Sequence, residues 1–303
     1  MTRLAPTPSG LLHAGNALSF VLTWALARAG GGRVLLRIDD LDAARVRPEY
    51  LANIFATIDW LGIDYDLGPR DMRDYHANWS RDRRMPHYTD LLNRLTGTGR
   101  VYACTCSRRE LDERRAAGLR EDDLYVCRNR NLPLETAGAA WRIRVPEGTR
   151  ISISTELKLA GVTGSSPESI DLTQEMGDFI VRRQDGVPAY QAASLAEDLH
   201  HGMDLIVRGA DLLPSTAAQR YLAGLLDDFG ASFLAARTVH HPLFLAESGE
   251  KLSKSADAAA VLQSNRADIF RQVSEWLGTS KATNGEQLLE AIAANPPTAL
   301  NTP

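Results

Sequence analysis

The stretch Pro6-Thr-Pro-Ser-Gly-Leu-Leu-His13-Ala-Gly15-Asn16 separates two segments of different pattern. Residues 2–5 before it are short and strand-like, and residues 13–29 carry apolar side chains at helical spacing. A helix N-terminus offers unpaired backbone N–H groups and a positive dipole end, which suit a phosphate. Gly15 would let a nucleotide approach the backbone, and His13 could donate to a phosphate oxygen. An ordinary Pro/Gly turn with a structural histidine is the alternative.

Alternating strand and helix patterns continue outward from this loop. Residues 33–38 form an apolar strand, and residues 48–61 form a helix that begins at Pro48 and stops before Gly62. This order predicts an α/β domain with a parallel sheet. Further helices are expected over 79–97, 190–200 and 213–229, with two helical patches in 264–295. Further strands are expected over 100–104, 179–182, 205–208 and 243–245, with a hairpin-type turn at 184–186.

The composition is that of a soluble globular enzyme: 303 residues, 44% hydrophobic and 24% charged. It excludes a disordered chain, a collagen-like chain and a small disulfide scaffold. The uncharged run from Leu4 to Ala27 is too interrupted by Pro, Gly, His and Asn to span a membrane. Without a secretory leader, we expect a cytoplasmic protein with no membrane partner. The net charge of −4 leaves nucleic-acid binding to local basic patches.

A second motif, Lys251-Leu-Ser-Lys254-Ser255, contains two of only four lysines in the chain. Lysine is a compact, mobile charge that can follow a phosphate as negative charge develops. The alternative is a solvated turn with ordinary surface lysines. The scarcity of lysine elsewhere favours the functional interpretation.

Three cysteines, Cys104, Cys106 and Cys127, lie in an arginine-rich segment. Residues 100–150 hold eleven arginines, eight acids and no lysine, which indicates an inserted subdomain. An odd number of cysteines argues against a closed disulfide framework, and three thiolates could hold a tetrahedral Zn²⁺. Buried structural thiols are the alternative. Arginines at 108–109, 114–115, 128 and 130 are candidate RNA phosphate contacts, although a solvated charged helix explains the first four nearly as well.

Together, the His13–Gly15 loop and the Lys251–Ser255 loop resemble the two motifs of class I aminoacyl-tRNA synthetases. Four more stretches resemble the glutamyl-tRNA synthetase catalytic domain: Arg3-Leu-Ala-Pro-Thr-Pro-Ser-Gly, Arg37-Ile-Asp-Asp-Leu-Asp42, Ala189-Tyr190 and Ile206-Val-Arg-Gly-Ala-Asp211. The resemblance covers residues 2–256. Fewer than fifty residues follow Ser255, too few for an anticodon-binding part. With the cysteines, the chain therefore resembles the truncated glutamyl-Q tRNA(Asp) synthetase family.

This resemblance implies a Rossmann-type class I catalytic domain with an inserted zinc-binding, acceptor-type subdomain and no anticodon-binding domain. The expected divisions are 1–99 and 178–256 for the two catalytic halves, 100–177 for the insert and 257–303 for a helical tail. The implied activity is ATP-dependent formation of glutamyl-adenylate without tRNA, followed by transfer of glutamate to queuosine at the wobble position of tRNA(Asp). One structural Zn²⁺, Mg²⁺ with ATP and a monomer are expected. A glutamate-activating paralogue with another acceptor, or a non-catalytic RNA- or amino-acid-binding regulator, are the alternatives.

The resemblance also implies roles for individual residues. Catalysis falls to His13 and Lys254, and ATP binding to His13, Gly15, Asn16, Lys251, Ser253 and Lys254. Glutamate binding falls to Arg3, Ala5, Thr7, Asp39, Tyr190 and Arg208, and metal binding to Cys104, Cys106, Tyr125 and Cys127.

Alternative roles and departures from the family pattern accompany these assignments. Arg208 favours an acidic substrate because the glutaminyl enzymes lack an arginine there. A structural ion pair is the alternative for Arg3 or Arg208. A buried structural role is the alternative for Tyr190. Asp39 stands where the family commonly has Glu. The place expected for the ligand tyrosine holds Asp123, which leaves the fourth ligand open.

Overall fold

The structure is a computed structural model, and it describes residues 1–119, 121–154, 159, 168–243 and 261–297. Lys251, Ser253 and Lys254, with the rest of the second motif, lie outside the described residues. Within the described residues, no helix is long and apolar enough to cross a membrane.

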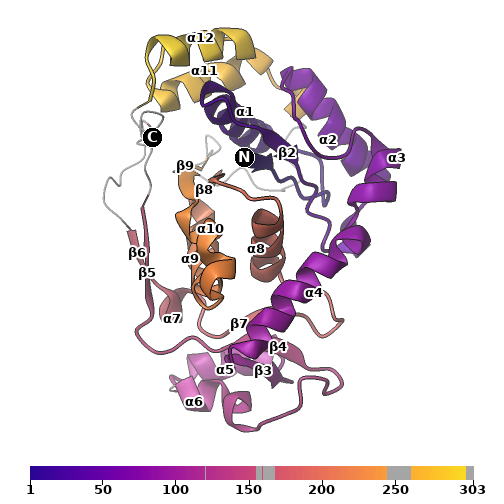
Figure 1. Cartoon of the computed structure of the whole chain (residues 1–303), viewed down its shortest axis with the longest axis vertical. Coiled ribbons are helices and arrows are strands. Elements are labelled where there is room, and N and C mark those ends of the chain that lie inside the picture. Colours follow the sequence, from indigo (N-terminus) through magenta and orange to yellow (C-terminus); the bar gives the residue numbers. More distant parts are fainter. Residues whose placement is uncertain (120, 155–158, 160–167, 244–260, 298–303) are drawn as a thin grey trace.

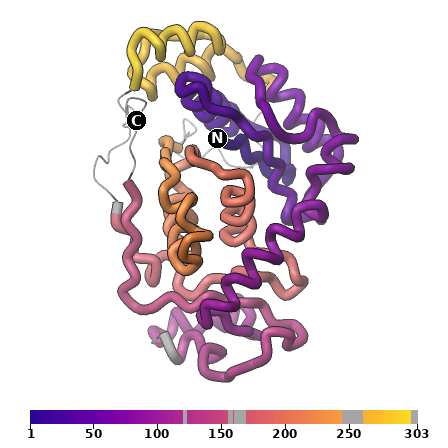
Figure 2. Tube along the Cα trace, viewed as in Figure 1, coloured from indigo at the N-terminus to yellow at the C-terminus, as the bar shows by residue number. Residues whose placement is uncertain are grey.

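The N-terminal strand and helix lie beside the C-terminal helices, in the upper part of the view (Figures 1 and 2). Strand β1 (Thr2–Leu4) pairs in parallel with β2 (Val34–Leu36), and α1 (Ala14–Ala29) connects them. Helix α2 (Pro48–Leu61) has Pro48 in its first turn and ends at Gly62, whose φ of 68° is the left-handed conformation that glycine adopts readily. The α/β prediction for this region is therefore confirmed.

A second parallel pair lies directly beside β1. Strand β8 (Leu205–Gly209) pairs with β9 (Arg237–His241), and the Thr2 hydroxyl donates to the Leu205 carbonyl at 2.7 Å. The spatial order is thus β2, β1, β8, β9. The chain adds β2 on one side of β1 and later adds β8 and β9 on the other side, so the order of the strands reverses between β1 and β8. In open α/β sheets, ligands bind outside the carboxyl ends of the strands at such a switch point.

The residues between the two parallel pairs form two antiparallel sheets, and the first of these lies at the end of the molecule far from the C-terminal helices (Figure 1). Strands β3 (Val101–Cys104), β4 (Ala140–Ile143) and β7 (Phe179–Arg182) form one sheet, and β5 (Arg150–Ile153) pairs with β6 (Glu168–Asp171). Because β7 hydrogen-bonds to β4, this sheet crosses the expected division at residue 178. The division of the chain into domains remains a prediction.

Helices surround both parallel pairs and complete the core. Their bounds are α3 (Met72–Asp74), α4 (Arg81–Gly97), α5 (Arg108–Ala116), α6 (Glu121–Leu124), α7 (Leu172–Glu175), α8 (Tyr190–His200), α9 (Leu213–Gly224), α10 (Asp227–Ala235), α11 (Arg266–Leu277) and α12 (Gly285–Ala294). A π-helix, η2 (Tyr75–Trp79), precedes α4, and short 3-10 turns are η1 (Ala43–Arg45), η3 (Val126–Asn129), η4 (Ala210–Leu212) and η5 (Val261–Gln263). Helices α11 and α12 pack against one side of α1, and strands β1 and β8 pack against the other, so α1 is buried on both sides.

Two secondary-structure predictions are wrong. The single helix expected over 213–229 is two helices, α9 and α10, because Asp227 adopts a φ of 47° that ends helical geometry. The two helices then pack closely, and a Cβ on Gly230 would lie 1.9 Å from the Ala223 carbonyl oxygen. The strand expected over 243–245 is also wrong at Leu243, where the strand has already ended at His241. Residues 244 and 245 lie outside the described residues.

Candidate active site

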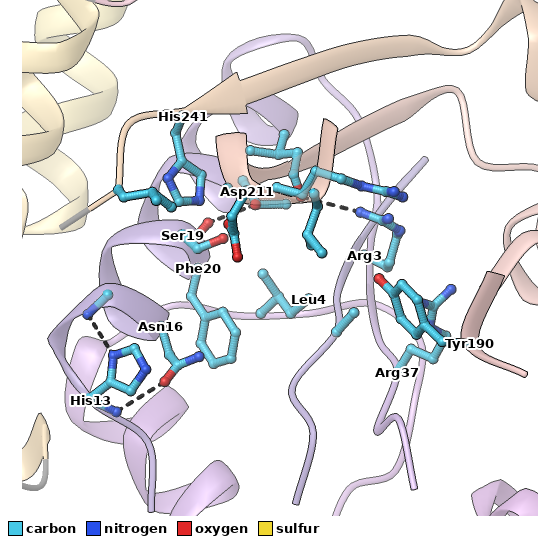
Figure 3. Close-up of a pocket in the computed structure, with 18 residues that line it drawn as sticks. Arg3, Leu4, His13, Asn16, Ser19, Phe20, Arg37, Tyr190, Asp211 and His241 are labelled. Carbon is cyan, nitrogen blue, oxygen red and sulfur yellow. Dashed lines mark hydrogen bonds between the residues drawn. The ribbon is translucent and has the colours of Figure 1, made fainter. Parts of the chain in front are cut away.

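A cavity of about 250 Å³ opens where the carboxyl ends of β1, β8 and β9 meet the start of α1. Figure 3 shows His13 and Asn16 of α1 on one side of this pocket and Arg3, Arg37 and Tyr190 on the other. Seven predicted site residues line it: Arg3, Ala5, His13, Gly15, Asn16, Tyr190 and Arg208. Among its described lining residues, the acid is Asp211 and the basic side chains include three arginines, so the lining suits an anionic ligand.

His13 is the N-cap of α1, and the cap determines its tautomer. The Gly15 N–H donates to His13 Nδ1 at 3.1 Å, while the His13 N–H donates to Asn16 Oδ1 at 3.0 Å. A ring nitrogen that accepts carries no proton, so the neutral ring carries its proton on Nε2. His13 is therefore arranged as an Nε2–H donor at the helix N-terminus.

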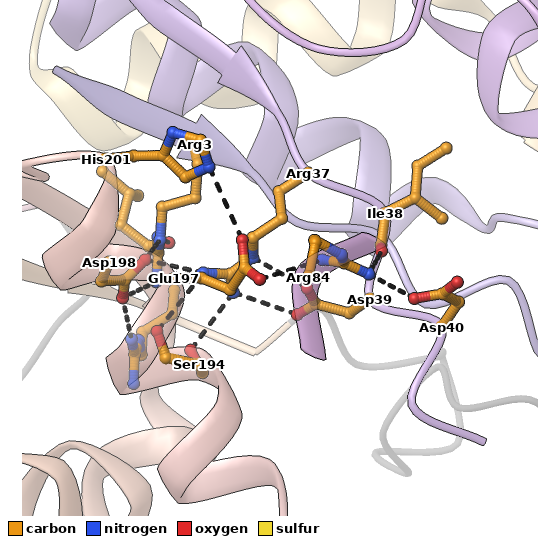
Figure 4. Close-up of polar contacts among 12 residues, drawn as sticks. Arg3, Arg37, Ile38, Asp39, Asp40, Arg84, Ser194, Glu197, Asp198 and His201 are labelled. Carbon is orange, nitrogen blue, oxygen red and sulfur yellow. Dashed lines mark hydrogen bonds and ion pairs between the residues drawn. The ribbon is translucent and has the colours of Figure 1, made fainter. Parts of the chain in front are cut away.

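A buried carboxylate that the sequence reasoning did not identify, Asp198 of α8, connects the arginines of the pocket (Figure 4). Arg3 Nε donates to Asp198 Oδ1 at 2.9 Å, and Arg37 Nη1 donates to the same oxygen at 2.7 Å. The Asp198 side chain is fully buried. Burial would raise its pKa, but Arg3, Arg37 and Arg208 outweigh burial and hold the pKa below its usual value.

The three arginines differ in how many of their donors are used. Arg37 is fully engaged, by Asp39, Asp198 and Ser194. Arg3 gives Nε and Nη2 to Asp198 and Nη1 to the Val207 carbonyl. Thus the structural ion pair weighed as an alternative does form at Arg3, although Arg3 also lines the pocket.

Arg208 has the fewest partners of the three. Its Nη1 donates to Gln219 Oε1 at 2.8 Å, but its buried Nε and Nη2 have no hydrogen-bond partner among the described residues. Asp198 Oδ2 lies 3.8 Å from Nη2, beyond hydrogen-bond distance. Burial lowers the pKa of Arg208 to about 10. Buried donors without acceptors are unusual in proteins and indicate a missing partner.

Two predicted glutamate-binding residues do not line the pocket. Thr7 is exposed outside it, and Asp39 is bound through both carboxylate oxygens to Arg37, at 2.8 and 3.0 Å. Burial raises the pKa of Asp39 more than the neighbouring Arg37 lowers it. In this arrangement Asp39 acts as a partner of Arg37, and its role towards a ligand stays a prediction.

The three cysteines converge, as the sequence predicts for a metal site. The sulfur atoms of Cys104, Cys106 and Cys127 lie within 4.8 Å of one another, and those of Cys106 and Cys127 are 3.5 Å apart. Thiolates on a tetrahedral Zn²⁺ lie about 3.8 Å apart, given zinc–sulfur bonds of about 2.3 Å. The donor set therefore fits zinc, and a metal at this position would join the end of β3 to η3.

Tyr125, the predicted fourth ligand, is buried with Leu111 and Leu124 beside this cluster. Its hydroxyl lies against Gly177, where an added Cβ would be 2.0 Å away. Its role as a ligand stays a prediction. Arg128, a candidate phosphate contact, is instead buried and donates to Asp178 twice at 2.6 Å, so this interpretation of Arg128 is wrong.

Comparison with known proteins identifies the family. The model of class I tRNA synthetases (E and Q), catalytic domain, matches residues 1–272. The chain is 40% identical over 264 residues to the glutamyl-Q tRNA(Asp) synthetase of Nitratidesulfovibrio vulgaris, covering 83% of this chain and 76% of that protein. It is 35% identical over 294 residues to that of Burkholderia cenocepacia, covering 96% and 92%. The chain belongs to the glutamyl-Q tRNA(Asp) synthetase family.

Members of this family are ligases of the aminoacyl-tRNA synthetase type, and the fold agrees with that class. The glutamate-tRNA synthetase of Elizabethkingia anophelis superposes with a TM-score of 0.73 at 22% identity, over 96% of this chain. This chain spans only 65% of the length of that solved chain. The class I α/β fold predicted from the two motifs is therefore confirmed.

Sequence reasoning missed the residues behind the pocket of this synthetase-family chain, namely Asp198, Gln219 and His240. Of the three, Asp198 has the clearest signal in the sequence, because it lies among small and apolar residues in the predicted 190–200 helix. An acid on the buried face of a helix requires a cation partner, and arginine was already predicted nearby.

Proposed function

We propose that the chain activates L-glutamate with ATP to glutamyl-adenylate without tRNA, and then transfers glutamate to queuosine at the wobble position of tRNA(Asp). The observation that carries the activation step is Arg208, whose buried Nε and Nη2 lack hydrogen-bond partners among the described residues. These two N–H groups form one edge of a planar guanidinium, which matches a carboxylate with two parallel bonds. Both atoms are covered, so neighbouring pocket side chains must shift as the carboxylate enters.

The other end of the pocket supports a nucleotide. His13 offers an Nε2–H donor beside the N-terminus of α1, where backbone N–H groups and the helix dipole favour phosphate. In-line attack of the glutamate carboxylate on the α-phosphorus expels pyrophosphate, and it asks the protein mainly to position reactants and stabilise charge. Mg²⁺ would arrive with ATP and neutralise its phosphates.

The acceptor assignment rests on the family, since the relatives named glutamyl-Q tRNA(Asp) synthetase cover most of the chain. A structural zinc at Cys104, Cys106 and Cys127 would order the subdomain that faces the RNA. The exposed arginines of α5, which pair on the surface with Glu113 and Asp112, remain candidates for phosphate contacts.

The first experiment measures ATP–pyrophosphate exchange without tRNA, with glutamate, glutamine or aspartate. We expect kcat/KM for glutamate to exceed that for glutamine or aspartate by a large factor, because only the side-chain carboxylate of glutamate has the charge and length for Arg208. Exchange with none of the three would overturn the activation step. Transfer is then measured on tRNA(Asp) with and without queuosine, and equal transfer to both would overturn the acceptor assignment while leaving activation intact.

Lys254→Ala tests the second motif. We expect normal folding and a fall of about 100-fold in adenylate formation, the size seen when one donor to transition-state charge is removed. The matched control is Lys281→Ala, which removes another of the four lysines outside the motif. Exchange at the wild-type rate in Lys254→Ala would remove this lysine from the mechanism.

A further inference from the structure

Gln219 of α9 contacts Arg208 at Nη1, away from the Nε and Nη2 atoms that lack hydrogen-bond partners among the described residues. Gln219 is completely buried, and its Oε1 accepts from Arg208 Nη1 at 2.8 Å. Its Nε2 has no hydrogen-bond partner among the described residues. The amide oxygen faces Arg208 because a guanidinium has only donors, so the contact defines which way the amide points.

Thr216, one helical turn earlier on the same face of α9, supports the same nitrogen. Its hydroxyl oxygen accepts from Arg208 Nη1 at 3.3 Å and lies 2.9 Å from His240 Nε2. The same hydroxyl donates to the Leu212 carbonyl at 3.1 Å. A hydroxyl has one proton, so Thr216 must accept from both Arg208 and His240, and His240 then carries its proton on Nε2.

His240 reaches this position through strand pairing. In the parallel ladder of β8 and β9, Arg208 and His240 are direct partners, so both side chains point to the same face. Arg208 is thus held by a three-residue clamp made of Gln219, Thr216 and His240, which comes from two elements and is buried throughout.

The chemistry of the clamp matters as much as its geometry. An acid at position 219 would form an ion pair with Arg208 and neutralise the charge that a substrate carboxylate needs. A glutamine accepts one hydrogen bond without adding a second negative charge to that of Asp198, which lies 3.8 Å from Arg208 Nη2. The clamp therefore directs the guanidinium without competing with an anionic ligand.

We propose that Gln219, with Thr216 and His240, is a positioning element that sets the preference of this site for a carboxylate over a carboxamide side chain. The inference rests on the proposed function, because it assigns the specificity of the same pocket. Gln219 acts through Arg208 and touches no reacting atom, so it is a positioning residue.

The test compares Gln219→Glu, Gln219→Met and wild type in ATP–pyrophosphate exchange, with glutamate and with glutamine. For Gln219→Glu we expect the KM for glutamate to rise about tenfold or more, while the KM for ATP changes by less than about twofold. The ratio of kcat/KM for glutamate to that for glutamine falls by the same factor. Gln219→Met, which keeps the volume but removes the acceptor, gives a smaller change in the same direction.

A second pair of variants guards against misfolding at position 219. Thr216→Val removes the hydroxyl of the clamp, and Thr57→Val makes the same change at a buried threonine of α2 whose hydroxyl donates to the Asn53 carbonyl. Each hydroxyl donates to the carbonyl four residues earlier, so each substitution removes the same kind of hydrogen bond and should lower the free energy of unfolding by a similar amount. We expect a higher KM for glutamate in Thr216→Val alone.

The outcomes separate the two proposals. No glutamate-dependent exchange by wild type overturns the proposed function and this inference with it. Wild-type exchange combined with an unchanged KM and an unchanged glutamate preference in the Gln219 and Thr216 variants overturns the inference alone. A fall in kcat without any change in KM or preference also overturns it, since that pattern marks a merely structural role.

Discussion

The arginines of the pocket come from β1, the end of β2 and β8, and their buried carboxylate from α8, whereas the three cysteines come from the end of β3, the loop after it and η3. In the pocket, the buried carboxylate of Asp198 pairs with Arg3 and Arg37, which are 195 and 161 residues away in sequence. Beside the cysteines, the local hydrophobic cluster consists of Leu111, Leu124 and Tyr125. The comparison teaches that the pocket is ordered by long-range contacts in the main core, while the cysteine region has only a small local core of its own.

The largest expected effect is a loss of folding stability when the buried carboxylate behind the pocket is removed. Asp198→Asn leaves three buried arginines without their shared charge partner and should lower the free energy of unfolding by about 3–5 kcal/mol. The control, Asp90→Asn, breaks the exposed Arg94–Asp90 pair on α4 and should cost at most about 1 kcal/mol. Urea unfolding followed by tryptophan fluorescence measures both. Equal losses in the two variants would contradict a fold-ordered charge network.

The second effect separates charge from geometry at Arg208. Arg208→Lys keeps a positive charge near Asp198 but loses the planar edge, so kcat/KM for glutamate should fall about 100-fold. The control, Arg220→Lys on α9, changes a half-buried arginine whose Nη1 donates to the Leu234 carbonyl, outside the pocket. Pyrophosphate exchange at varied glutamate measures both variants. An Arg208→Lys enzyme as efficient as wild type would show that charge alone suffices.

The contrast between the two regions also explains what could be predicted from the sequence. Helices with local start and stop residues were found to the residue, as at Pro48–Leu61 and Tyr190–His200. The cysteines and the pocket arginines were found from motifs whose residues lie close in sequence or resemble a family. Their chemistry is visible before folding.

What was missed depends on contacts between distant segments. Strand β9 was not predicted, because four of its five residues, Arg237–His241, are polar and they form a strand only by pairing with β8. The break between α9 and α10 coincides with the positive φ of Asp227, a backbone conformation that the local composition does not indicate. Asp198 and Gln219 are ordinary helix residues by composition, and only their burial against arginines gives them a role.

The third effect is the pH dependence of folding stability, and it comes from His240 behind the pocket. Burial lowers the pKa of His240 to about 3, so the folded protein keeps it neutral while the unfolded chain protonates it below about pH 6.5. The unfolded state therefore binds more protons between these values, and stability falls as pH decreases from 6.5 towards 3. Between pH 7 and pH 5 the share of His240 is about 2 kcal/mol.

His240→Gln should reduce this pH dependence by about the same amount, since glutamine does not titrate. The control is His76→Gln, the same substitution at an exposed histidine. Urea unfolding at several pH values measures the slopes. Identical slopes for wild type and His240→Gln would show that His240 is not held neutral in the folded protein.

The smallest expected effect on the pocket comes from removing the metal, and it tests whether the two regions are independent. Protein purified without chelators should contain one zinc per chain, and Cys127→Ser should contain less. Because the cysteine region has so small a core, chelation should remove hydrogen-exchange protection over residues 101–130. The pocket draws its order from β1, β8 and α8, so glutamate-dependent exchange should change by less than about twofold. Loss of exchange on chelation would show that the cysteine region supports the pocket, and protein without zinc would show that Leu111, Leu124 and Tyr125 suffice to order the segment.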